Sequence, residues 1–211
     1  LMLKPHQEGA VDACLEAMLG GGHGFLTAHG MGLGKTISMM AMLDSWSSRF
    51  KSARAVVCCP KSLIHQWSAE FANWETLISV DNYAVTDKDP TVTRFLRPWF
   101  KHGGVAIVGH DQFRRIWKHF NIDKETIVVV DEAHILKHVK TEMYKVIKGL
   151  PTTRRVFLTG SPVQNNLLEY YNLIQLLAPG FLGSTPAKFV EMYETPIQAG
   201  MSKGADTELI R

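Results

Sequence analysis

The glycine-rich stretch of residues 28–36 constrains this chain more than any other part of its sequence. It consists of Ala-His-Gly-Met-Gly-Leu-Gly-Lys-Thr, follows an apolar run that predicts a short buried strand, 25–28, and precedes a run that predicts a helix, 37–46. A strand, a glycine-rich turn, Lys-Thr and a helix in this order are typical of a phosphate-binding loop. The glycines let backbone N–H groups converge on phosphate oxygens, and the positive end of the helix dipole points to the same place. The sequence therefore predicts a nucleotide site on this loop.

Two side chains of the loop have predicted chemical roles. Lys35 is placed to reach the β- and γ-phosphates of a nucleotide, and Thr36 to put its hydroxyl on Mg²⁺. The loop departs from the strict pattern at His29, where glycine is usual, and a glycine-rich turn that only happens to precede Lys-Thr is the alternative. The predicted nucleotide-binding residues of the loop are His29, Gly30, Met31, Gly32, Leu33, Gly34, Lys35 and Thr36.

Strand and helix patterns alternate along the chain, whose hydrophobic content of 45% and charged content of 20% are ordinary for a globular domain. This alternation predicts an α/β domain of three layers, with a mostly parallel central sheet and a ligand at the carboxyl ends of its strands. The β-branched run 126–130 is the clearest strand. The other expected strands are 25–28, 55–59, 79–85, 105–108 and 155–158, and the expected helices are 8–19, 37–46, 63–74, 91–101, 112–120, 135–150, 166–177 and 186–193.

Charge, cysteines and hydropathy limit the classes of protein. A net charge of +3 permits nucleic acid as a partner but does not argue for it. The three cysteines, Cys14, Cys58 and Cys59, are odd in number and lack metal-site spacing, so we expect reduced thiols in an intracellular protein. No apolar run approaches the roughly 20 residues of a membrane span, and no signal peptide is present, so no membrane partner is expected. Because the chain begins with Leu1, we expect it to be a piece of a larger protein.

A pair of acids, Asp131 and Glu132, follows the β-branched strand 126–130. An enzyme that hydrolyses nucleoside triphosphates needs two acids at such a place. One, here Asp131, holds the water shell of Mg²⁺, and its neighbour, here Glu132, orients or deprotonates the attacking water. The alternative is a solvated turn that happens to contain two acids. The predicted catalytic residues are thus Lys35, Asp131 and Glu132, and the predicted metal-binding residues are Thr36 and Asp131.

The acids belong to Asp131-Glu132-Ala133-His134, and with this motif the chain resembles the Snf2 family of DNA translocases, within the helicase-like ATPases. The resemblance covers nearly all 211 residues. It implies a RecA-like P-loop fold, ATP and Mg²⁺ as ligands, a DNA-dependent ATPase activity, double-stranded DNA and chromatin with its nucleosomes as partners, and a place in the nucleus.

The resemblance also assigns further site residues. Gln7, in Leu3-Lys4-Pro5-His6-Gln7, is similar to the family's glutamine that reads the adenine base. Lys61 and Ser62, followed by Trp67 and Glu70, resemble a motif that in the family lies along the DNA backbone. The residues that resemble coupling positions between nucleotide state and DNA are His134, Thr159, Gly160, Ser161, Gln164 and Asn165, with Ser161 in place of the more usual threonine.

The residues before the loop lysine indicate a subgroup. Most Snf2 proteins carry acids there, whereas Ala28-His29-Gly30 resembles the ATRX and ARIP4-like branch. The segments 103–109, 134–137 and 196–200 are similar to the same branch. The Snf2 domain of the kinetoplastid base-J-binding protein has a similar Ala-His-Gly loop and is the alternative within the family.

One part of the family's machinery is missing from this chain. In the family a second lobe supplies arginines that reach the γ-phosphate, and no Gln-x-x-Gly-Arg-x-x-Arg pattern occurs here. The resemblance therefore implies residues 1–195 as the N-terminal RecA-like lobe and 196–211 as an extension toward a missing second lobe. Such a lobe is expected to be weakly active when isolated. The alternatives are a lobe of a strand-separating helicase, a nucleotide kinase, and a nucleotide-binding interaction module that does not hydrolyse ATP.

Overall fold

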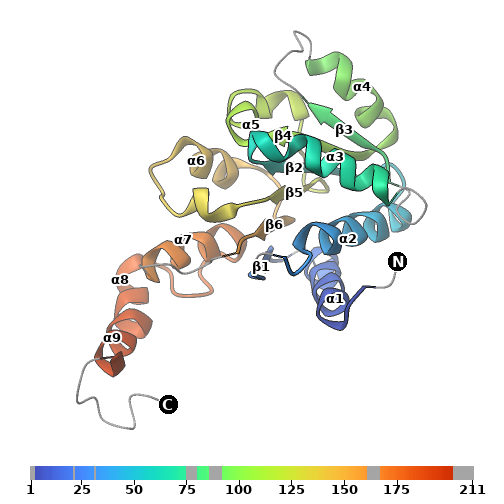
Figure 1. The fold of residues 1–211 in the computed structure, drawn as a ribbon. Coiled ribbons are helices and arrows are strands. Elements are labelled where there is room, and N and C mark those ends of the chain that lie inside the picture. Colours follow the sequence, from blue (N-terminus) through green and yellow to red (C-terminus); the bar gives the residue numbers. More distant parts are fainter. Residues whose placement is uncertain are drawn as a thin grey trace.

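The computed structural model describes residues 3–20, 22–30, 32–74, 80–85, 92–160 and 167–201. Within these ranges six strands form one sheet in the order β1-β6-β5-β2-β4-β3 (Figure 1). All five neighbouring pairs are parallel, which confirms the predicted parallel sheet. The strands are β1 (Phe25–Thr27), β2 (Arg54–Cys59), β3 (Asn82–Val85), β4 (Gly104–Gly109), β5 (Ile127–Val130) and β6 (Arg155–Leu158).

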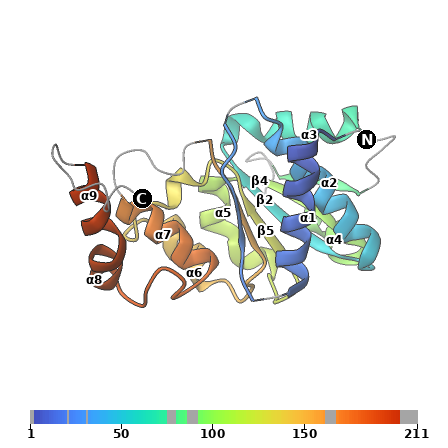
Figure 2. The ribbon, with the colours of Figure 1, turned by 90° about the horizontal axis from the view of Figure 1, so that it is seen from below.

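Helices cover both faces of the sheet, as the unbroken apolarity of the strands requires. Successive strand residues point to opposite faces, so Val57 and Val129 are buried against α1, α2 and α3, whereas Val56 and Val128 are buried against α4 to α7 (Figure 2). This arrangement confirms the predicted three-layer α/β domain. The helices are α1 (Pro5–Gly20), α2 (Lys35–Arg49), α3 (Ile64–Asn73), α4 (Val92–His102), α5 (His110–Ile116), α6 (Glu142–Gly149), α7 (Leu167–Leu177), α8 (Pro186–Phe189) and α9 (Thr195–Met201).

The predicted helix 135–150 is wrong in its first half. The chain forms a short 3₁₀ helix, Ala133–Leu136, and α6 begins only at Glu142, where the Thr141 hydroxyl accepts a hydrogen bond from the amide of Tyr144 at 3.3 Å. The reason is tertiary. Lys137 is buried, its ammonium lies 3.3 Å from the Glu169 carboxylate on α7, and its carbonyl accepts a hydrogen bond from Asn172 on the same helix. These contacts hold the segment against α7 in place of helical hydrogen bonds.

The helical arm at the end of the described chain leads away from the sheet (Figure 1). It consists of α8, a π-helical turn at Val190–Glu194, and α9. The domain boundary expected after residue 195 falls next to the first residue of α9 and stays a prediction.

The carboxyl ends of the strands place three predicted motifs at one edge of the sheet. The phosphate loop follows β1, the acid pair follows β5, and Thr159 follows β6. The amide of Thr159 donates to the Thr27 carbonyl of β1 at 3.1 Å. The opposite edge carries Arg155, the first residue of β6, and Arg154, which precedes it. Arg155 is buried there and donates to the carbonyls of Leu150, Thr152 and Leu176.

All three cysteines are buried and free, in agreement with the prediction of reduced thiols. Burial raises the pKa of Cys14 to about 12, so this thiol is not a nucleophile at neutral pH. None of the helices in the described ranges is long and apolar enough to cross a membrane.

Candidate nucleotide site and adjoining groove

The phosphate loop connects β1 to α2 through two glycines in the left-handed region. Gly32 has φ 78° and Gly34 has φ 80°, a conformation that a side chain disfavours. A Cβ on Gly34 would also lie 2.1 Å from the Gln7 amide nitrogen. The backbone angles of Gly34 therefore favour glycine, and a side chain there would also displace the Gln7 side chain. Met31 lies outside the described residues.

Lys35 is the first residue of α2, and its side chain turns back over the loop. Its ammonium donates to the carbonyls of His29 at 2.8 Å and Gly30 at 3.1 Å. Thr36, the next helical residue, makes no side-chain hydrogen bond within the part of the chain that the structure describes. The ammonium, the Thr36 hydroxyl and the α2 amides lie together at a helix N-terminus, which is the arrangement that binds phosphate.

Gln7 braces this loop from α1. Its side-chain oxygen accepts from the Lys4 amide at 2.9 Å, and its side-chain nitrogen donates to the Leu33 carbonyl at 3.2 Å. The side chain is buried, and each end of the amide retains one hydrogen-bonding position. The neighbouring His6 ring also lies 3.2 Å from the Leu33 carbonyl. Sequence reasoning anticipated a base-reading role for Gln7 but not this contact with the loop.

Replacement of Gln7 separates its predicted role in reading the adenine base from its contact with the phosphate loop. We expect Gln7→Ala to lower the preference for ATP over GTP by about five- to tenfold, since one lost hydrogen bond is worth about 1 kcal/mol. Competitive binding of the two nucleotides measures this ratio. The matched control is Gln175→Ala, because the Gln175 amide also bonds two backbone groups, those of Gly180 and Gly183, but lies on α7. An equal loss of affinity for both nucleotides would leave Gln7 as a brace of the loop only.

Asp131 is a buried carboxylate at the end of β5. One carboxylate oxygen accepts from the Trp67 indole at 3.0 Å, and the other accepts from the Glu132 amide at 2.9 Å. Burial raises the pKa of Asp131, and these two hydrogen bonds oppose that effect. No ion pair to Asp131 is found among the described residues. A buried carboxylate whose oxygens each keep a free lone pair fits a hard cation.

The described residues contain no cluster of three or more His, Cys, Asp or Glu side chains that would hold a metal by itself. Magnesium binds instead through one or two protein ligands and the phosphates of a nucleotide. The Asp131 carboxylate and the Thr36 hydroxyl are oxygen donors of the required kind. The residues present therefore fit Mg²⁺ that arrives with a nucleotide.

Glu132 is held in a strained backbone conformation, with φ 50° and ψ 49°. This region is unfavourable for residues with a Cβ, and such strain gathers at functional sites. The Glu132 carboxylate lies 3.1 Å from the His134 ring nitrogen Nδ1. The structure thus brings Glu132 and His134 into direct contact.

The loop and the acids are near neighbours without touching. Strand β6 separates β1 from β5, and no hydrogen bond or ion pair joins Lys35 or Thr36 to Asp131 or Glu132 in the described chain. Thr159 and Gly160 follow β6, between the two groups. The remaining predicted coupling residues, Ser161, Gln164 and Asn165, lie outside the described residues.

A groove of about 940 Å³ adjoins the acids on the far side of β5. One wall is the segment 60–65, which includes the predicted DNA contacts Lys61 and Ser62. The other wall begins at the end of β4 and continues into α5. Two side chains of this second wall, Arg114 and Arg115, are basic, and Asp111 is paired with Arg114 at 3.5 Å. The lining residues are Pro60, Lys61, Ser62, Ile64, His65, Gly109, His110, Asp111, Gln112, Arg114 and Arg115.

His110 is a site residue that sequence reasoning missed. Its ring nitrogen Nε2 lies 2.9 Å from the Asp131 carbonyl and 3.2 Å from the Cys58 carbonyl. Burial lowers the pKa of His110, so the ring is neutral at neutral pH, and because carbonyls only accept, Nε2 carries the proton. The available signal was a polar residue close after the predicted strand 105–108. In the structure His110 directly follows β4, as Asp131 directly follows β5.

Comparison with known proteins decides the family. The model of the SNF2-related domain matches residues 6–209. The chain belongs to the SNF2 family. The phosphate loop, the acid pair and the groove all lie within the matched residues.

The relatives of this SNF2 domain are much longer than the chain itself. It is 34% identical to the Drosophila melanogaster transcriptional regulator ATRX homolog over 94% of this chain and 18% of that protein. It is 30% identical to Homo sapiens transcriptional regulator ATRX over 100% of this chain and 10% of that protein. Arabidopsis thaliana CHROMATIN REMODELING 20 is 32% identical over 90% and 14% of the two chains. These matches confirm the ATRX-like branch, and they do not support the base-J-binding alternative.

Solved structures confirm the fold. The Sulfolobus solfataricus SWI2/SNF2 ATPase core in complex with dsDNA has a TM-score of 0.77 and 24% identity, over 99% of this chain and 42% of that one. The Sulfolobus solfataricus SWI2/SNF2 ATPase core domain has a TM-score of 0.76 and 23% identity, over 99% of this chain and 41% of that one. The SNF2 domain described here thus has the RecA-like fold of that core and spans less than half of it.

Proposed function

We propose that this SNF2 domain is the ATP- and Mg²⁺-binding lobe of a double-stranded DNA translocase that remodels chromatin. One observation carries the proposal. The Lys35 ammonium lies at a glycine loop and a helix N-terminus. The buried carboxylate of Asp131, which has no ion-pair partner among the described residues, lies at the same edge of the sheet. A nucleotide triphosphate with Mg²⁺ complements this pair of groups.

The residues of the loop bind and orient the nucleotide. The Lys35 ammonium exchanges its carbonyl partners for phosphate oxygens, and the α2 amides contact the same phosphates. Asp131 and Thr36 would hold Mg²⁺, which would supply charge neutralisation at the phosphates. Glu132 accepts a hydrogen bond from the attacking water and takes its proton as the water oxygen bonds to the γ-phosphorus. The bond from that phosphorus to the β–γ bridging oxygen breaks in the same displacement, and ADP leaves with its electron pair. His134 orients the Glu132 carboxylate through the 3.1 Å contact between them.

The groove is the proposed contact with the DNA backbone. Lys61, Arg114 and Arg115 line it, and lysine and arginine neutralise phosphates without reading bases. The similar Sulfolobus core is described in complex with dsDNA, and several relatives are named as transcriptional regulators or chromatin remodelling proteins. These names support duplex DNA, chromatin and a nuclear location for the present protein.

Two other functions remain distinguishable by experiment. A strand-separating helicase would open a duplex in an ATP-dependent manner, and a nucleotide-binding interaction module would bind ATP without turnover. The ATRX-like relatives favour the translocase over both.

The loop assignment is tested by Lys35→Ala. We expect ATP to bind about ten- to a hundredfold more weakly, because a charge-assisted hydrogen bond contributes about 1.5–3 kcal/mol. Isothermal titration of ATP with Mg²⁺ measures the change. Lys145→Ala is the matched control, since Lys145 is an exposed, ion-paired lysine on α6. Equal ATP affinity for all three proteins would contradict the phosphate-binding role of Lys35.

A further inference from the structure

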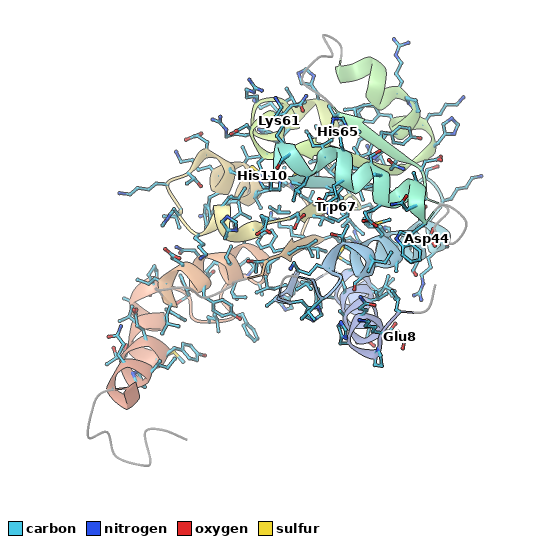
Figure 3. All side chains as sticks on the ribbon, in the orientation of Figure 1. Glu8, Asp44, Lys61, His65, Trp67 and His110 are labelled. Atoms are coloured by element: carbon cyan, nitrogen blue, oxygen red, sulfur yellow. The ribbon has the colours of Figure 1, made fainter. Side chains whose placement is uncertain are left out.

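Asp131 accepts one hydrogen bond from each of the two segments that form the walls of the groove. Trp67 follows the wall segment 60–65 on α3, and its indole N–H donates to the Asp131 carboxylate at 3.0 Å. His110 is part of the opposite wall, and its Nε2–H donates to the Asp131 carbonyl at 2.9 Å. Figure 3 shows Lys61, His65 and Trp67 along one helical segment, with His110 beside them. Asp131 is therefore held from both sides of the groove.

The Trp67 contact crosses from the groove to the nucleotide site. Ile64 lines the groove, and Trp67, three residues later on α3, is on the same buried face of the helix. Trp67 is only 1% exposed, so its ring moves with the helix and not independently of it. A shift of the wall at Lys61 and Ser62 is consequently a shift of the donor that orients the Asp131 carboxylate.

The His110 contact acts on the backbone of the same residue. Its Nε2 also reaches the Cys58 carbonyl at 3.2 Å, so the ring joins the carboxyl ends of β2 and β5 to the first turn of α5. Arg114 and Arg115, one turn further along α5, line the groove. A ligand that contacts these arginines bears on the helix whose first residue fixes Asp131.

We propose that Trp67 and His110 are positioning residues that link a DNA backbone in the groove to the placement of the Asp131 carboxylate for Mg²⁺. The inference rests on the proposed function, because it takes the groove as the DNA contact and Asp131 as the metal carboxylate. Partners that orient a metal ligand alter metal affinity by about 10- to 100-fold when removed. Two ligands that share such an element alter each other's affinity by about 5- to 150-fold, and they do so reciprocally.

The central variant is Trp67→Phe, which keeps an aromatic ring and removes only the N–H donor. Its matched control is Trp99→Phe, because Trp99 is equally buried and its indole donates to the Gly104 carbonyl at 2.9 Å, at the opposite edge of the sheet. Far-UV circular dichroism and thermal unfolding of both variants compare their folding. His110→Phe removes the second donor in the same way, and it carries the test if Trp67→Phe does not fold.

The first readout is binding and needs neither DNA nor turnover. A fluorescent, non-hydrolysable ATP analogue is titrated with Mg²⁺, and Trp67→Phe is expected to need about 10- to 100-fold more Mg²⁺ than the wild type. Trp99→Phe is expected to match the wild type. In an Asp131→Asn background, Trp67→Phe should have no further effect on the Mg²⁺ requirement, because the Trp67 indole then has no carboxylate to position. A wild-type Mg²⁺ requirement in Trp67→Phe would overturn the positioning role.

The second readout is the coupling between DNA and nucleotide. In the wild type a short duplex should change the affinity for the Mg²⁺-bound analogue, and the analogue should change the affinity for the duplex by the same factor. In Trp67→Phe the duplex and the analogue should no longer change each other's affinity, whereas the affinity for the duplex in the absence of nucleotide should match the wild type. Retained coupling in Trp67→Phe would overturn the link. A wild type that binds the analogue but no duplex would reject the proposed DNA contact and the link with it, while the Mg²⁺ titration still decides the role of Trp67.

Discussion

The chain alone is expected to hydrolyse ATP about 10³- to 10⁵-fold more slowly than a chain of the same sequence that also carries a second RecA-like lobe. The reason is charge. Phosphoryl transfer needs cations around the moving γ-phosphate, and an arginine finger contributes a factor of this size in other phosphoryl-transfer enzymes. The cations proposed for this lobe are Lys35 and Mg²⁺.

Three buried or ion-paired arginines, Arg54, Arg154 and Arg155, are engaged elsewhere. Arg54 is ion-paired with Asp123 at the start of β2, Arg155 begins β6 and Arg154 directly precedes it, so all three lie at the edge of the sheet opposite the phosphate loop. Arg154 is paired with Glu125 at 2.8 Å, and Arg155 donates to three backbone carbonyls. None of these three guanidinium groups is placed to reach a phosphate at the loop.

Steady-state ATP turnover with and without duplex DNA tests this expectation on both forms of the chain. The chain alone should be slow and little stimulated by DNA, because fewer DNA phosphates are neutralised by one lobe than by two. Strong DNA-stimulated hydrolysis by a verified monomer would contradict a two-lobe mechanism. If turnover per molecule rises with protein concentration, an arginine supplied by a second copy is tested first by mixing the wild type with Lys35→Ala.

Glu132→Gln is expected to reduce kcat by about 10²- to 10⁴-fold in a chain that carries both lobes, the range for loss of a general base. The amide cannot take the proton of the attacking water. ATP and Mg²⁺ should bind as in the wild type, because Asp131 and not Glu132 is the proposed metal carboxylate. Single-turnover hydrolysis and equilibrium binding of ATP separate the chemical step from binding.

The matched control for this variant is Glu142→Gln. Both glutamates contact a basic side chain, Glu132 at His134 and Glu142 at Lys145, but Glu142 lies on the outer surface of α6. Glu142→Gln should leave turnover unchanged. Unchanged turnover in Glu132→Gln as well would move the water-orienting role to another residue, and weakened Mg²⁺ binding would make Glu132 a metal-binding residue instead.

The structure also shows where local patterns fail. Residues 137–141 were predicted to be helical, yet the buried pair of Lys137 with Glu169 and the hydrogen bond from Asn172 hold them against α7. Glu169 and Asn172 lie more than 30 residues further along the chain. No local pattern of hydrophobic spacing includes such partners, so the end of one helix and the start of the next depended on tertiary contacts.

The phosphate loop, the acid pair and the alternation of strands and helices could be predicted from local sequence patterns, because they depend on glycine conformations, β-branched runs and helical spacing within a few residues. Parallel strands then required the loop, Asp131 and Thr159 to leave the sheet at one edge. The strand order, the hydrogen bond from Gln7 to Leu33, and the contacts of Trp67 and His110 with Asp131 depend on long-range packing and could not be predicted from local patterns. Trp67 and Asp131 are 64 residues apart in the chain, and a hydrogen bond at that separation exists only after the sheet and its helices have packed together.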